Sequence, residues 1–171
     1  MPAKVYGYLA NSFGFNDYGR LQLRGIIKDV AETGIIPLEP FEVCAADPEI
    51  SALWGEINSA DSYSRKAGLG REFNRKIRLK NEETMERCSL MIPILDGIRD
   101  PGLADEIRFF CMKGLGPVYA LHTETSTAET PGTHFHAHTD DLVWSSGGRI
   151  CKSREEWLQA MEGFYKELKG A

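Results

Sequence analysis

Residues 90–107 read LMIPILDGIRDPGLADEI, a run in which a strand, a turn and the start of a helix follow one another. The apolar residues Leu90 to Leu95 predict a strand that is buried on both faces. Asp96-Gly97 is a turn pair, and Asp100-Pro101 is a typical cap and first residue of a helix that Gly114 would end. The unit is therefore a β-strand followed by an α-helix.

Further strands and helices alternate on both sides of this unit. Strands are predicted at Lys4 to Ala10, Ile35 to Leu38 and Pro117 to Leu121. Helices are predicted from Asn16 or Asp17 to Gly34, from Asp47-Pro48 through Ile57, over Arg71 to Cys88, and from the capping box of Ser153 and Glu156 through Leu168. A loop is predicted at Asp61 to Gly70 and an irregular insertion at Thr123 to Thr139. The pattern predicts one doubly wound α/β domain over residues 1–171, flavodoxin- or Rossmann-like, with a mainly parallel sheet flanked by helices.

Composition and charge exclude several classes of protein. Of the 171 residues, 42% are hydrophobic and 26% are charged, as in ordinary globular proteins. The net charge of −5 argues against a nucleic-acid partner. No apolar run reaches the ~18 residues of a membrane span, and the first residues lack a secretory signal, so we expect a cytoplasmic protein without a membrane partner. The four cysteines have no CxxC spacing, and we expect neither a structural metal nor a cofactor.

A carboxylate interrupts the apolar side of the helix after Leu95. Ligands of open α/β sheets bind beyond the carboxyl ends of the strands, which here follow Ala10, Leu38, Leu95 and Leu121. Glu106 shares one helical face with Leu103 and Phe110, and Ile107 and Cys111 extend that face. Glu106 is either a functional carboxylate in a cleft or a local cap at an exposed helix start. Asp100 has a sufficient explanation as a cap, although a capping carboxylate can also contact a ligand.

The opposite side of the same helix is also apolar. Phe109 and Met112 lie there, and a helix that is apolar on two faces is commonly buried twice. This pattern predicts a homo-oligomer in which both residues lose solvent exposure.

The segment Asp96-Gly97 through Asp100, Gly102, Ala104 and Glu106 resembles the signature of the nucleoside 2-deoxyribosyltransferases. Tyr8-Leu9-Ala10 and Phe15-Asn16 are similar to the first strand and the glycosyl-site loop of that family, and the resemblance extends over most of residues 4–121. It implies that Glu106 attacks C1′ of the deoxyribose, and that a second base then displaces the glutamate with retention. It also implies that the Tyr8 hydroxyl holds the Glu106 carboxylate, and that Asp100 contacts the leaving base and aids its protonation. Tyr6 lies on the same face of the strand as Tyr8, so Tyr6 could be the tyrosine that holds the carboxylate instead.

The resemblance further implies a set of substrate-binding residues, several of which depart from the family. They are Asn81, which replaces an aspartate that grips the sugar hydroxyls, Asn11 and Ser12, which replace a Gly-Pro pair, Phe13, and Asp141, the best local match to an asparagine from a neighbouring subunit. Asn81 could instead be an exposed helix residue. Ser89 replaces a common aspartate and Arg108 a glycine. The expected partners are a small-molecule nucleoside, a free base and further copies of the chain.

Three alternatives stay open. The first is a nucleoside or nucleotide hydrolase of the same fold, in which Ser12 and Arg20 would be the only pair available near the first loop to grip a 5′-phosphate. The second is a metal-binding module, because His134, His136 and His138 would point to one side of a strand. The third is a non-catalytic relative, which the departures at Asn81, Asn11 and Arg108 would allow.

Overall fold

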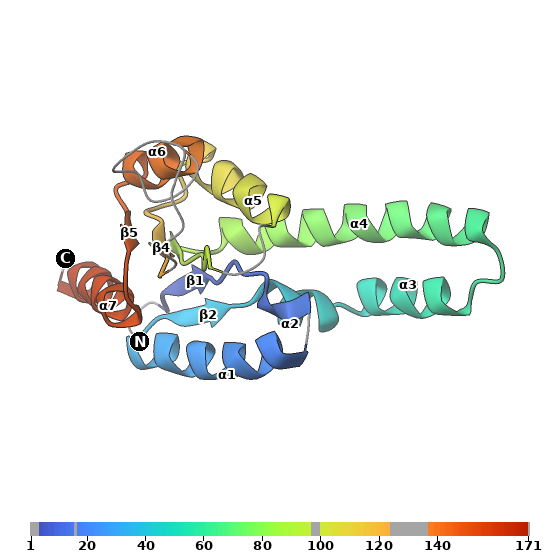
Figure 1. Ribbon diagram of the computed structural model, residues 1–171, viewed down its shortest axis with the longest axis horizontal. Helices are drawn as coiled ribbons and strands as arrows, with labels where there is room; N and C mark the ends of the chain where they lie inside the picture. The colour runs from blue at the N-terminus through green and yellow to red at the C-terminus, as the bar shows by residue number, and fades with distance from the viewer. Residues whose placement is uncertain (1–3, 16, 97–99, 124–136, 171) are drawn as a thin grey trace.

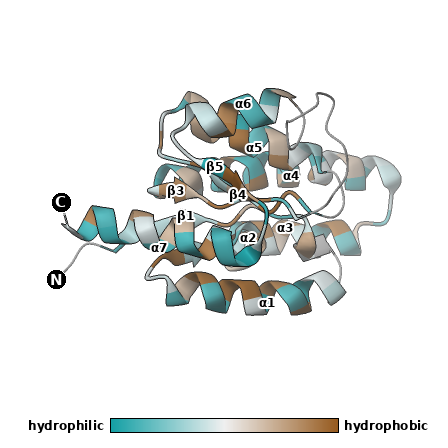
Figure 2. Cartoon of the chain, turned by 60° about the vertical axis from the view of Figure 1, so that its left-hand side comes forward, coloured by the Kyte–Doolittle hydropathy of each residue, from teal (hydrophilic) through white to brown (hydrophobic). Residues whose placement is uncertain are grey.

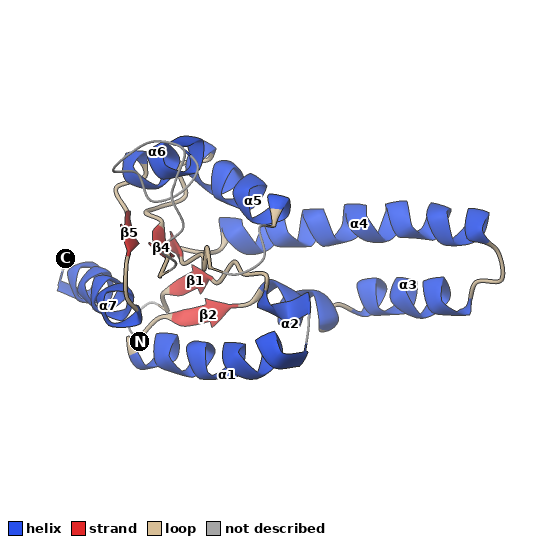
Figure 3. Ribbon diagram, viewed as in Figure 1, coloured by secondary structure: helices blue, strands red, loops and turns tan. Residues whose placement is uncertain are grey.

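The computed structural model describes residues 4–15, 17–96, 100–123 and 137–170. Its strands are β1 (Tyr6–Tyr8), β2 (Ile36–Leu38), β3 (Leu90–Met91), β4 (Tyr119–Leu121) and β5 (Arg149–Cys151). Its helices are η1 (Phe13–Phe15), α1 (Asp17–Glu32), α2 (Pro40–Ala45), α3 (Pro48–Ser59), α4 (Tyr63–Glu86), α5 (Pro101–Met112), α6 (Ala137–Ser145) and α7 (Arg154–Gly170). Helices make up most of the chain, and the short strands gather between them (Figure 3).

The strands form a parallel sheet. β1 pairs in parallel with β2 and β3, with Tyr8 opposite Leu38 and Met91. β4 pairs in parallel with β5, and parallel bridges from Met91 to Val118 and from Ile94 to Leu121 connect the two parts. The resulting order, β2-β1-β3-β4-β5, is that of flavodoxin-like sheets. The predicted α/β class with a parallel sheet is confirmed.

A hydrophobic core lies on each face of the sheet. α1 and α7 cover one face with side chains that include Leu23, Val30, Trp157 and Met161. α4, α5 and α6 cover the other with Met85, Leu103, Ile107, Phe110 and Val143. Alternate residues at the end of β1 and just after it point into opposite cores. Leu9 belongs to the first core, and Tyr8 and Ala10 belong to the second. Figure 2 shows the strands between these two layers of helices.

The helices α3 and α4 run side by side and project far beyond the sheet (Figure 1). The predicted loop at Asp61 to Gly70 is wrong, because α4 already begins at Tyr63, where the Ser62 side chain accepts a hydrogen bond from Arg65 N. Gly68 and Gly70 each cost about 1 kcal/mol relative to alanine, which the packing on α3 offsets. Trp54 and Phe73 supply part of that packing, with ring centroids 5.4 Å apart. In the described part of the chain no helix is both long and apolar enough to cross a membrane.

The last third of the chain holds two elements that the pattern did not predict. α6 begins at Ala137, so the irregular prediction is wrong for residues 137–139; residues 124–136 lie outside the described residues. β5 has only three residues, too few for a visible alternation. The predicted capping box before α7 is present, with Ser153 Oγ accepting from Glu156 N at 3.1 Å. Gly34, with a φ of +92°, follows α1 as expected.

Candidate active site

Glu106 lies in the second turn of α5, on the side of the helix that packs on the sheet. Leu103, Ile107 and Phe110 are buried around it, as the apolar stripe predicts. Asp100 caps the helix, and its Oδ1 accepts a hydrogen bond from Gly102 N at 2.8 Å. The Asp100 cap thus fixes where α5 begins, and α5 places the Glu106 carboxylate among apolar side chains.

The two oxygens of Glu106 have different surroundings. The Tyr8 hydroxyl donates to Oε1 at 2.8 Å, and Asn81 Nδ2 donates to the same oxygen at 2.9 Å. Among the described residues, none donates a hydrogen bond to Oε2. Two donors therefore hold Oε1, whereas no described residue donates to Oε2.

The residues that hold Glu106 come from separate elements of the fold. Tyr8 is the last residue of β1 and is fully buried, while Asn81 lies on α4. Cys44 of α2 extends the chain of contacts, since its thiol donates to Asn81 Oδ1 at 3.4 Å. The structure places Tyr8, and not Tyr6, at the carboxylate.

Burial dominates the electrostatics of this cluster. It raises the pKa of Glu106 to about 7, although the hydrogen bonds from Tyr8 and Asn81 act in the opposite direction. The charges of Asp100 and Glu39 add to the rise. Burial, followed by the neighbouring Glu106, raises the pKa of Tyr8 far above its ordinary value, so its hydroxyl stays a donor. Glu106 thus changes charge near neutral pH beside a permanent donor.

Glu39 is a second buried carboxylate that the sequence reasoning missed. It follows β2 directly and is 2% exposed. Its Oε1 accepts from Asn11 Nδ2 at 3.0 Å, and its Oε2 accepts from Glu42 N at 2.8 Å, which caps α2. Burial raises its pKa against these bonds. Its place directly after the strand end at Leu38 was the signal that could have identified it.

The loop after β1 is held internally. Asn11 is buried and donates to Leu9 O at 3.0 Å as well as to Glu39, while its Oδ1 accepts from Phe13 N at 2.9 Å. Ser12 is buried, and Phe13 packs against the core on the α1 side of the sheet. The structure brings these three residues to the strand edge without a hydrogen bond to Glu106 among the described contacts.

Comparison with solved structures identifies proteins of the same architecture. A conserved protein from Enterococcus faecalis V583 aligns with a TM-score of 0.66 and 23% identity over 95% of this chain and 99% of that chain. The 2-desoxiribosyltransferase from Leishmania mexicana aligns at 0.57 and 18%, over 95% and 97%. The 2-deoxyribosyltransferase from Bacillus psychrosaccharolyticus aligns at 0.51 and 15%, over 81% and 82%.

The chain has the fold of the 2-deoxyribosyltransferases. No protein-family model matches the sequence, and no curated protein matches it either. The likeness therefore lies in the three-dimensional fold.

Two further predictions concern the side of α5 and α6 that faces away from the sheet. Asp141 is exposed on α6, and the described contacts do not join it to Glu106, Tyr8 or Asn81. Met112 is 72% exposed, while Phe109 is partly buried with Lys113 Nζ 5.4 Å from its ring centre. The subunit contact that would involve these residues stays a prediction.

The described residues bear on two of the remaining alternatives, the metal-binding module and the grip on a 5′-phosphate. His134 and His136 lie outside them and His138 is exposed on α6; within the described ranges no three His, Cys, Asp or Glu side chains are grouped to hold a metal ion. Arg20, the arginine considered for a 5′-phosphate, donates through Nε to Gly14 O at 2.8 Å.

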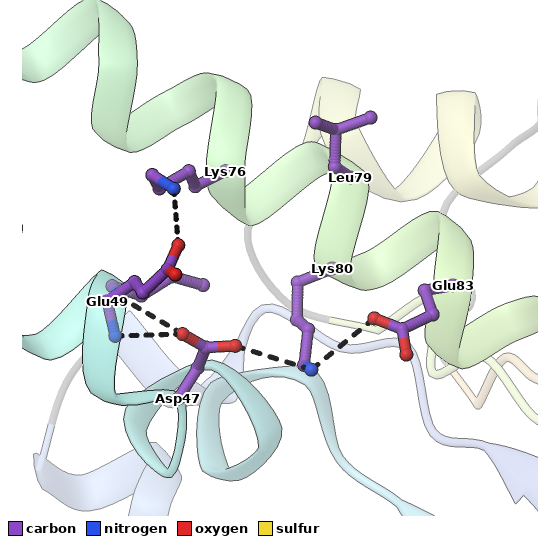
Figure 4. A pocket seen from close by; sticks show the side chains of 7 residues that line it. Asp47, Glu49, Lys76, Leu79, Lys80 and Glu83 are labelled. Carbon is purple, nitrogen blue, oxygen red and sulfur yellow. Dashed lines mark hydrogen bonds and ion pairs between the residues drawn. The ribbon is translucent and has the colours of Figure 1, made fainter.

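A pocket of about 200 Å³ lies between α3 and α4 (Figure 4). Its charges pair with one another, since Lys76 Nζ is 2.6 Å from Glu49 and Lys80 Nζ is 3.3 Å from Asp47. Asn81 is turned about 100° round α4 from Lys80, as helix geometry requires. The residues that line the pocket do not include Tyr8, Asn81 or Glu106, so it is separate from the Glu106 cluster.

Proposed function

We propose that this chain is a nucleoside 2-deoxyribosyltransferase-like enzyme. It cleaves the N-glycosidic bond of a (deoxy)nucleoside through a covalent glycosyl-Glu106 and transfers the sugar to another base. The observation that carries the proposal is the arrangement of Glu106 at the strand edge, with Oε1 held by Tyr8 and Asn81 and Oε2 unengaged among the described residues. The fold of the 2-deoxyribosyltransferases is consistent with it.

The first half of the reaction uses the unengaged oxygen. Glu106 Oε2 attacks C1′ of the sugar, the C1′–N bond breaks, and its electron pair leaves on the base nitrogen. Asp100, at the start of the same helix, contacts the leaving base and aids its protonation by passing on a proton from solvent. The two donors on Oε1 orient the carboxylate, and no described residue donates a hydrogen bond to Oε2.

The second half reverses the first. A nitrogen of an incoming base attacks C1′, the C1′–Oε2 bond breaks, and the electron pair returns to Glu106. The proton of the incoming base passes by way of Asp100 to solvent. Two inversions at C1′ restore the original configuration, as in retaining glycoside chemistry.

The remaining substrate contacts come from the residues around this edge. Asn11, Ser12 and Phe13 shape the loop after β1, and Asp141 would act from a neighbouring subunit of a homo-oligomer. The substrates are a small-molecule nucleoside and a free base, and the chemistry requires no metal or cofactor.

Incubation with a deoxynucleoside donor and a different free base tests the proposal. Chromatography should show the exchanged nucleoside, and the Glu106→Gln variant should not produce it. Formation of free sugar without exchange would favour the hydrolase. In that case a comparison of a nucleoside with its 5′-monophosphate would test whether Ser12 and Arg20 grip a phosphate. If the wild-type chain neither exchanges nor hydrolyses, the proposal is wrong.

A further inference from the structure

The contacts of Asn81 differ from those expected of a residue that binds the sugar, which is the role that the resemblance implies for it. A residue that binds the sugar would direct its polar atoms toward the substrate. Here Nδ2 donates to Glu106 Oε1 at 2.9 Å, and Oδ1 accepts from the Cys44 thiol at 3.4 Å. Each end of the amide therefore has a protein partner, and the bond to Glu106 gives Asn81 a role that sugar binding alone would not require.

We propose that Asn81 is a positioning residue for the nucleophile, oriented by Cys44, and not a residue that grips the sugar. This assignment rests on the proposed function, in which Glu106 Oε2 reacts with the sugar. Asn81 then helps to hold the other oxygen, Oε1, in place. The thiol keeps the amide oxygen turned toward α2, and the amide nitrogen then faces the carboxylate. An aspartate at this position would have no proton to donate to an ionised Glu106.

The charged and titratable groups around Glu106 decide how the effect can be measured. Tyr8 from β1, Glu39 from the end of β2, Cys44 from α2 and Asp100 from the start of α5 face the carboxylate, together with Asn81 of α4. Within this set Asn81 and Tyr8 donate hydrogen bonds to Glu106, and both bonds favour its ionised form. Burial raises the pKa of the Cys44 thiol to about 11, so the thiol stays protonated and able to donate at neutral pH.

Loss of the Asn81 donor should make Glu106 harder to ionise. A hydrogen bond to a charged group is strong enough to move a pKa by about one unit or more. In Asn81→Asp a second carboxylate replaces the donor, so the rise should be larger than in Asn81→Ala. The acid limb of the pH profile of kcat/KM should move to higher pH by the same amount, because only ionised Glu106 can attack.

The direct test is a ¹³C NMR titration of the Glu106 carboxyl, assigned by its absence in Glu106→Gln. We expect its pKa to rise in Asn81→Asp and Asn81→Ala, and to rise less in Cys44→Ala. Cys44→Ser should restore the wild-type value, because the hydroxyl can donate to the same amide oxygen.

Two matched controls accompany these variants. Asn74→Asp places the same new charge on an exposed position of α4, about 10 Å along the helix, and should leave the pKa unchanged. Cys111→Ala removes a thiol that donates to Leu142 O and should also leave it unchanged. An unchanged Glu106 pKa in both Asn81 variants, or a rise in KM with an unchanged pH profile, would overturn the inference. The titration needs no turnover, so an inactive wild-type chain would reject the proposed function without deciding the role of Asn81.

Discussion

The two carboxylates at the strand edge, the buried Glu39 after β2 and the partly buried Glu106 on α5, are held in different ways. Each accepts at least two hydrogen bonds. At Glu39 the bonds are divided between the two oxygens, and the residue is 2% exposed. At Glu106 both side-chain bonds fall on Oε1. Glu39 is therefore committed to the structure, whereas Glu106 retains an acceptor that the described residues do not use.

The distribution of bonds, and not burial itself, separates the two roles. Burial raises the pKa of both groups. A carboxylate with two engaged oxygens closes a loop and caps a helix, as Glu39 does for α2. A carboxylate held by one oxygen is oriented and still able to react.

The largest expected effect is on catalysis at Glu106. Glu106→Gln keeps an oxygen for Tyr8 and Asn81 but removes the charged nucleophile, so base exchange should fall by about a thousandfold or more. The rate of exchange, measured at saturating donor, is the readout, with circular dichroism to verify the fold. Near-normal exchange by this variant would remove Glu106 from the mechanism.

Tyr8→Phe should have the next largest effect. The ring is retained and only the hydroxyl that donates to Oε1 is lost, which should reduce kcat/KM at neutral pH by roughly 10- to 100-fold. The pKa of Glu106 should rise, so the loss should shrink as the pH is raised. A pH profile that keeps its acid limb in place would show that Tyr8 only packs in the core.

The stability of the two carboxylate variants should change in opposite directions. Glu39→Ala leaves Glu42 N without its acceptor, removes one of the two acceptors of Asn11 Nδ2, and should lower the free energy of unfolding by about 2 kcal/mol. Glu106→Gln should raise it at pH 8 on the order of 1–2 kcal/mol, because the wild-type carboxylate must be ionised there while partly buried.

The pH dependence of the second effect follows from the sign of the shift. Burial on folding raises the pKa of Glu106 from its ordinary value of 4.5 to about 7. Its contribution to stability is therefore fully present below about pH 4.5 and is lost as the pH rises through 7. Urea unfolding at pH 5 and pH 8 should show the gain of Glu106→Gln growing with pH. A gain that is equal at both values would contradict the shift.

The smallest expected effect on stability concerns Asp100, whose replacement by asparagine should also slow base exchange because the amide cannot take part in proton transfer. Asp100→Asn preserves a good helix cap, so stability should stay within about 0.5 kcal/mol of wild type. The negative charge of Asp100 raises the pKa of Glu106, and its removal should move the acid limb of kcat/KM slightly to lower pH. A shift to higher pH would mean that the two carboxyls do not interact as the structure indicates.

The fold could be predicted from sequence because its signals are local and periodic. The buried run Leu90 to Leu95 and the capped helix after Asp100 have recognisable patterns of their own. The first turns of α4 have no such pattern. Gly68 and Gly70 are held in a helix by packing on α3, and this packing leaves no signal in the local sequence. β5 is too short to show a period.

The candidate site was predictable only in part for a similar reason. Glu106 was visible because it interrupts an apolar stripe, and the resemblance led to Tyr8. Glu39 was missed although it follows a predicted strand end. The contact between Cys44 and Asn81 joins residues 37 positions apart and depends on how α2 and α4 meet, so only the tertiary structure could provide it.

Direct detection of the covalent intermediate tests the central claim. Wild-type enzyme is mixed with a deoxynucleoside donor in the absence of acceptor base, quenched rapidly, digested and analysed by peptide mass spectrometry. The account predicts a deoxyribosyl adduct on Glu106 that disappears when an acceptor base is added, and no adduct on Glu39 or in Glu106→Gln. An adduct on another residue, or base exchange that continues with Glu106→Gln, would contradict it.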